Sequence, residues 1–132
     1  MTKPQAPAPV GGEVRTAMTR VFVTGLKVQA EIGVYRHEIG KRQPLVVDVE
    51  LDVPSAGSAR LAETVNYESI LQAARDIADQ GHIELVESFA DRLAQACMAD
   101  SRVTRARVRV EKPLALAPDA VAAGVEIVVE RV

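Results

Sequence analysis

The sequence contains few of the residues that build disulfides, metal centres or nucleic-acid interfaces. Only one of its 132 residues is a cysteine, Cys97, and only two are histidines. A single cysteine cannot form an internal disulfide, which fits a reducing cytoplasm. One cysteine and two histidines are also too few ligands for a zinc or iron–sulfur site. The net charge of -2 leaves no dominant basic surface. We therefore expect neither a metal site nor a nucleic-acid partner.

Long apolar runs are also missing. No stretch approaches the roughly 18 residues that a membrane span requires, and the start of the chain, MTKPQAPAP, lacks the hydrophobic region of a secretory signal. Residues 1–18 are rich in proline, glycine and small side chains, which predicts a disordered tail. Residues 19–132 have the length of one domain. These features favour a small cytoplasmic domain without a membrane partner.

Four segments carry apolar residues at every second position, which predicts strands with one apolar face. The first begins at Arg20 and contains Gly25, which suggests a bulge or bend. The others cover residues 45–53, 105–111 and 124–131. Between the second and third strands, two segments have helical spacing instead.

The first predicted helix follows Asn66, a suitable N-cap, and Gly81 suits its C-terminal cap. The second has a continuous apolar stripe over residues 86–97. The resulting order, β-β-α-α-β-β, predicts an α+β fold with a four-stranded antiparallel sheet and both helices on one face. It does not match the ferredoxin-like order.

The polar face of the predicted sheet is charged. Acidic residues alternate along the second strand and arginines along the third: Asp48, Glu50, Asp52, Arg105, Arg107 and Arg109. Pairing of these opposite charges across the strands would help to fix the register, by roughly 0.2–1 kcal/mol per pair. Two interpretations are open, a solvated face or the polar lining of a closed oligomeric barrel, which would also remove both free sheet edges.

Four polar residues have positions suited to chemistry. Lys112 ends the third strand, and Glu87 lies in the first turn of the second helix, where the dipole keeps a carboxylate ionised for binding a flat donor–donor edge. Tyr67 starts the first helix, where it could stack on a ring, and Glu38 lies in a loop beside His37, which could be its acid–base partner. Ordinary surface or packing roles are the alternative for each of them.

Five short motifs occur in a fixed order along this pattern: IGVYRHE (32–38), RQPLVVDV (42–49), VNY (65–67), LVE (85–87) and EKP (111–113). From Arg20 to Val132 the chain resembles the dihydroneopterin aldolase family. The resemblance implies a tunnelling fold (T-fold), in which subunit sheets join into a ring-shaped β-barrel. It also implies a homo-octamer of two stacked tetrameric rings, or else a tetramer, with active sites between neighbouring subunits.

The implied reaction is a retro-aldol cleavage in folate biosynthesis. It converts 7,8-dihydroneopterin into 6-hydroxymethyl-7,8-dihydropterin and glycolaldehyde, and relatives often also epimerise the substrate to 7,8-dihydromonapterin. Because the imine of the dihydropterin itself can accept the electrons, neither a lysine Schiff base nor a metal is needed. We therefore expect no cofactor and a small pterin substrate.

The resemblance assigns roles to residues that match the motifs. Lys112 corresponds to the general acid/base. Glu87, beside the main chain of Val86, corresponds to the acid that binds the amino-amide edge of the pterin. Tyr67 corresponds to the tyrosine that enters the site from the adjacent subunit and contacts the ring and side chain, and Glu38 to an acid near the hydroxylated side chain.

The chain departs from the family at Ser88, where relatives often carry a larger basic or aromatic residue, and the family does not demand His37. Two alternative functions are open. One is a paralogous T-fold enzyme that only epimerises dihydroneopterin or its triphosphate, for which Arg36 is the one obvious basic residue near the side-chain end. The other is a non-catalytic ring module that binds a pterin or a partner. Release of glycolaldehyde would identify the aldolase.

Overall fold

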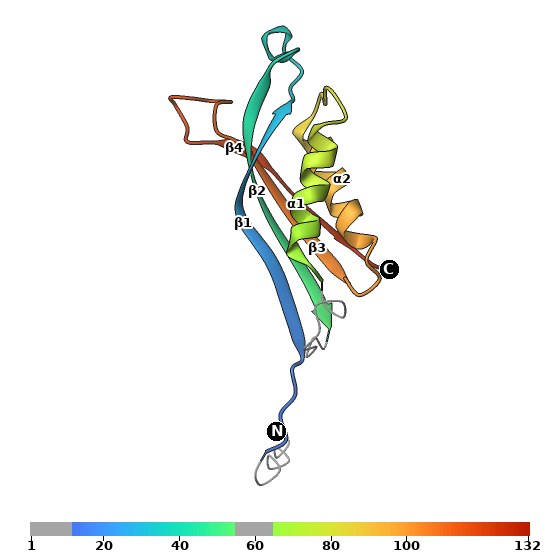
Figure 1. The fold of residues 1–132 in the computed structure, drawn as a ribbon. Coiled ribbons are helices and arrows are strands. Elements are labelled where there is room, and N and C mark those ends of the chain that lie inside the picture. Colours follow the sequence, from blue (N-terminus) through green and yellow to red (C-terminus); the bar gives the residue numbers. More distant parts are fainter. Residues whose placement is uncertain (1–11, 55–64) are drawn as a thin grey trace.

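The computed structural model describes residues 12–54 and 65–132, which form one antiparallel sheet and two helices (Figure 1). The strands are β1 (Met18–Glu31), β2 (Arg42–Pro54), β3 (Arg105–Lys112) and β4 (Ala123–Glu130). The helices are α1 (Tyr67–Ala78) and α2 (Val86–Met98), and a short 3₁₀ helix, η1 (Arg36–Glu38), lies between β1 and β2. The predicted element order is confirmed.

The predicted tail of residues 1–18 falls largely outside this description. Residues 1–11 are not among the described residues, and residues 12–17 belong to no helix or strand. β1 begins at Met18, the last residue of the predicted tail and two residues before the expected strand start at Arg20.

Both helices cover the same face of the sheet, whose strands follow the order β1-β2-β3-β4 (Figure 1). α1 packs against β1, whereas α2 packs against β3 and β4. The core lies between these layers, and its largest fully buried side chains include Phe89, Leu93, Ile70, Leu45 and Leu51. No helix in the described part of the chain is long and apolar enough to cross a membrane.

The register of β2 and β3 confirms the predicted alignment of opposite charges. The facing pairs are Asp48 with Arg109, Glu50 with Arg107 and Asp52 with Arg105. The ion pairs do not all follow this register. Glu50 reaches Arg107 at 3.8 Å, but Asp52 pairs with Arg20 of β1 at 2.8 Å, and Arg109 pairs with Glu111 of its own strand at 3.1 Å.

A bulge interrupts β1 where the sequence predicts one. Between Val23 and Leu26, β1 contains one residue more than the facing stretch of β2. Gly25 has a φ of 70°, a left-handed conformation that a glycine adopts without a Cβ clash. Its N–H donates to Oδ1 of Asp48 at 2.6 Å, so a side chain of the polar face holds the bulge in place. The inward-facing residues are odd-numbered before the bulge and even-numbered after it.

The ends of α1 agree with the prediction only at its start. The Asn66 side chain accepts the N–H two residues further on at 2.9 Å, which confirms the N-cap. The predicted cap at Gly81 is wrong, because the helix ends at Ala78 with Asp79 as its C-cap. The Gln80 N–H donates to the carbonyl three residues back, at 3.2 Å, so the last hydrogen bond of the helix end is made before Gly81.

Candidate functional site

Lys112 and Glu38 form an ion pair at one end of the sheet. Nζ of Lys112 lies 2.7 Å from Oε2 of Glu38, and the two side chains are only 15% and 11% exposed, respectively. Lys112 is the last residue of β3, and Glu38 is the last residue of η1. They meet because β2 starts just after η1 and pairs with β3, so the beginning of β2 lies beside the end of β3.

The Glu38 carboxylate accepts three hydrogen bonds. Besides Lys112, the donors are Nε2 of Gln43, at 3.0 Å, and the backbone N–H of Tyr35, at 3.3 Å. Burial of the carboxyl group favours a raised pKa, but these hydrogen bonds outweigh burial and lower the pKa of Glu38 to about 2. Glu38 is therefore ionised at neutral pH and provides a fixed acceptor next to Nζ of Lys112.

Gly33 supports the other side of this carboxylate. It has a φ of 132°, and a Cβ built at this position would lie 2.1 Å from the Glu38 carboxyl carbon. No side chain can occupy that space, so the carboxylate rests on the bare backbone of Gly33. The backbone conformation favours glycine here, and any side chain would displace the Glu38 carboxylate from its present position.

The pair opens into a cavity of about 410 Å³. Its lining residues are Tyr35, His37, Glu38, Lys41, Arg42, Gln43, Lys112, Leu114 and Ala115. The His37 ring stacks on Tyr35, with centroids 5.7 Å apart and planes within 7°. The sequence suggested His37 as a partner of Glu38, and this is wrong, because the carboxylate pairs with Lys112.

Glu87 and Val86 lie in the first turn of α2, as predicted, and Glu87 is exposed there. The segment before this helix is tied to the end of β1, because the Gly33 N–H donates to the Ile83 carbonyl at 3.0 Å. Since Gly33 also contacts the Glu38 carboxylate, the start of α2 lies at the same end of the sheet as the ion pair. An acidic side chain beside free backbone N–H groups can bind a ligand with both donors and acceptors on one edge.

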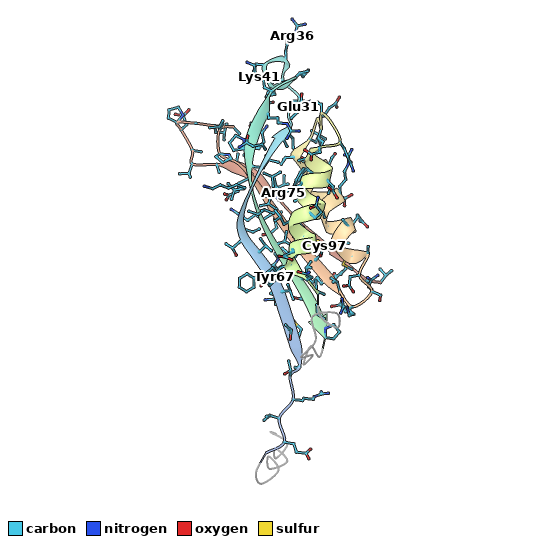
Figure 2. The ribbon with its side chains drawn as sticks, in the orientation of Figure 1. Glu31, Arg36, Lys41, Tyr67, Arg75 and Cys97 are labelled. Atoms are coloured by element: carbon cyan, nitrogen blue, oxygen red, sulfur yellow. The ribbon has the colours of Figure 1, made fainter. Side chains whose placement is uncertain are left out.

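Tyr67 lies at the opposite end of the sheet. Figure 2 shows it beside the lower part of β1, whereas Lys41, which lines the cavity of the ion pair, lies near the other end. Tyr67 borders a second cavity of about 560 Å³ together with Arg20 and Phe22. That part of β1 is level with Ala106 of β3, and the six residue-to-residue steps from Ala106 to Lys112 span about 20 Å. Within one chain, Tyr67 is therefore remote from Lys112.

Two further residues shape the site, and sequence reasoning assigns a role to neither of them. Gln43 donates both to Glu38 and, at 2.7 Å, to the Ile32 carbonyl, and Gly33 provides the contact surface. Both residues fall inside the motifs 32–38 and 42–49, but spacing alone does not reveal hydrogen bonds between neighbouring segments. Within the described ranges, no group of three or more His, Cys, Asp or Glu side chains could hold a metal ion.

Comparison with known proteins places the chain in a family. The family model for dihydroneopterin aldolase (FolB) matches residues 21–130. The dihydroneopterin aldolase of Methylorubrum extorquens is 35% identical over 103 residues, which are 75% of this chain and 79% of that relative. Two solved dihydroneopterin aldolases have the same fold.

The enzyme from Burkholderia thailandensis, bound to guanine, has a TM-score of 0.76 and 30% identity, covering 87% of this chain and 93% of that one. The Escherichia coli enzyme, in complex with neopterin, has a TM-score of 0.77 and 29% identity, covering 83% of this chain and 97% of that one. The matched family model spans nearly the whole described sheet and both helices. The chain belongs to the dihydroneopterin aldolase family.

Proposed function

We propose that this aldolase cleaves 7,8-dihydroneopterin into 6-hydroxymethyl-7,8-dihydropterin and glycolaldehyde. The observation that carries the proposal is the largely buried Lys112–Glu38 pair facing a cavity of about 410 Å³. It supplies a proton donor and a fixed acceptor within one hydrogen bond of each other. A hydroxylated side chain needs both of these partners when it loses and regains protons.

The chemistry requires one bond to break and two protons to move. The 2′-hydroxyl of the substrate loses its proton, its oxygen becomes the aldehyde of glycolaldehyde, and the bond between C1′ and C2′ breaks. The electron pair of that bond passes into the ring imine, and C1′ then takes a proton to give the hydroxymethyl group. In its neutral amine form Lys112 takes the hydroxyl proton, and the ammonium that results gives a proton to C1′, so the amine is regenerated; Glu38 holds the hydroxylated side chain.

Glu87 is the proposed anchor for the pterin ring. Neopterin and guanine, the ligands of the two solved relatives, both have a pyrimidinone ring with an amino group next to a ring N–H. A carboxylate can accept both of these donors at once, and the backbone N–H of Val86 can donate to a ring acceptor.

The complete site needs a second subunit, because Tyr67 is remote from Lys112 within one chain. In the described residues, β1 and β4 each pair with a strand on one side only. Pairing β1 of one subunit with β4 of the next would close the sheets into a ring. Closure of a barrel requires neighbouring strands to be staggered, and this stagger would move Tyr67 of one subunit along the barrel axis relative to the strands of the next. We expect two tetrameric rings stacked into an octamer, with the charged face of Asp48, Glu50 and Asp52 lining the barrel.

Mixing two inactive variants tests this shared site. Tyr67→Ala and Lys112→Ala are each expected to lose turnover, but subunits that are unfolded together and refolded as mixed rings should regain activity. A random mixture at equal amounts combines an intact Tyr67 with an intact Lys112 in about a quarter of the sites. The check is the rate of glycolaldehyde release. A mixture as inactive as its parents would show that the two residues do not meet across subunits.

The first assay of the function is incubation of the purified protein with 7,8-dihydroneopterin and a chelator. We expect hydroxymethyl-dihydropterin by chromatography and an equal amount of glycolaldehyde, because the substrate supplies its own electron sink. Formation of 7,8-dihydromonapterin alone would identify an epimerase instead. Unchanged substrate would contradict the proposal altogether.

A further inference from the structure

His82 lies in the connection between α1 and α2, and its ring reaches across to the end of β1. Nε2 of His82 is 2.8 Å from the carbonyl oxygen of Gly33. The next residue, Ile83, donates its N–H to the Glu31 carbonyl at 2.9 Å and accepts the Gly33 N–H at 3.0 Å. Residues 82–83 thus hold both polar backbone groups of Gly33.

The position of Gly33 in turn determines where the Glu38 carboxylate can lie. The carboxylate rests on Gly33, at a distance that excludes even a Cβ. Gln43 adds a second link, because its amide nitrogen donates to both the Ile32 carbonyl and Glu38. A rotation of the backbone at residues 32–33 would therefore move the carboxylate away from Lys112.

Gly33 does not fix its own conformation. A glycine has access to a wide range of φ and ψ angles, so a φ of 132° must be held by its surroundings. The Ile83 bonds hold the peptide before the Gly33 Cα, whereas His82 holds the carbonyl after it. The His82 bond is the contact that restrains rotation of this second peptide.

We propose that His82 is a positioning residue for the aldol cleavage, acting through the Gly33 carbonyl to hold Glu38 against Lys112. This inference rests on the proposed function. Because the partner is a carbonyl oxygen, Nε2 must carry a hydrogen, which both the imidazolium and one neutral tautomer provide. The required property is an N–H donor at this reach, so glutamine is a suitable replacement and leucine is not.

The test compares His82→Leu with His82→Gln, and Glu84→Ala serves as a control because Glu84 is an exposed residue of the same connection. We expect His82→Leu to lower kcat by about 10-fold, since a small displacement of reacting groups has effects of this size. The dissociation constant of guanine, which has the same ring edge but no hydroxylated side chain, should change by less than about 3-fold, because ring binding relies on Glu87. His82→Gln should recover kcat to within about 3-fold of wild type, and Glu84→Ala should match wild type.

A second readout does not depend on turnover. In an NMR titration of the carboxyl groups, the pKa of Glu38 should be higher in His82→Leu than in wild type, and unchanged in His82→Gln. An unchanged kcat and Glu38 titration in His82→Leu would overturn the inference, as would a glutamine variant as impaired as the leucine variant. If wild type does not cleave dihydroneopterin but the Glu38 titration responds as expected, the proposed function fails while the positioning role stands.

Discussion

Lys112→Ala is expected to lower kcat for glycolaldehyde release by about 10²–10⁴-fold, the usual contribution of general acid–base catalysis. The substitution removes the only proposed proton carrier while leaving the start of α2 untouched. The affinity for neopterin should therefore stay within about 3-fold of wild type, because a change in proton transfer alone affects kcat rather than binding. Steady-state kinetics and equilibrium binding of neopterin check the two halves of this expectation.

Glu87→Ala is the matched control, because it should have the opposite pattern. Loss of a charged acceptor for two donors is expected to weaken neopterin binding by about 10–100-fold. The Lys112–Glu38 pair remains intact in this variant, so the proton-transfer groups are still present. If Lys112→Ala turned over normally, or if Glu87→Ala bound neopterin as wild type does, the corresponding role would be refuted.

Gly33→Ala is expected to damage both stability and activity. The new methyl group would overlap the Glu38 carboxyl carbon at 2.1 Å, and the backbone would keep a φ that alanine rarely adopts. Backbone strain costs about 1–3 kcal/mol, whereas the Glu38 carboxylate lies at the end of a flexible side chain and can move aside, so we expect the free energy of unfolding to fall by about 1–3 kcal/mol. Displacement of Glu38 from Lys112 should also lower kcat by about 100-fold.

Gly25→Ala separates these two effects. Gly25 also has a positive φ, of 70°, but a Cβ there meets nothing within 4 Å. This variant should lose about 1 kcal/mol from backbone strain and retain its kcat. Denaturant unfolding and kinetics on both variants are the measurements. Full activity in Gly33→Ala would show that the contact between Gly33 and the Glu38 carboxylate is not needed for catalysis.

The fold is largely predictable from the sequence because its signals are local. Alternating apolar residues indicate the strands, and the Asn66 cap and apolar stripes indicate the helices. The Gly25 bulge is predictable too, since a glycine inside a strand pattern is typical of a bulge. The wrong C-cap at Gly81 shows the limit of such signals, because helix ends depend on which carbonyl the last amides reach.

The site is less predictable because it is built from contacts between distant segments. Position along the chain points to Lys112 and to Glu38 separately, but their direct pairing depends on strand register, and proximity in sequence offers only His37 as a candidate partner. The roles of Gly33 and His82 depend on a bridge between the end of β1 and the segment before α2. No periodicity in the sequence encodes that bridge.

The bulge in β1 sets a rule for how the length of this strand can change in evolution. Odd-numbered residues face the helices before the bulge and even-numbered residues face them after it. The extra residue at the bulge, next to Gly25, allows both halves to keep their apolar side chains on the same face. An in-frame deletion of that single codon would exchange the faces of one half, turning Arg20 and Phe22 toward the core and Val21 and Val23 away from it. Relatives that have lost or gained residues in β1 should therefore differ from this chain by two residues, or carry a compensating insertion elsewhere in the strand.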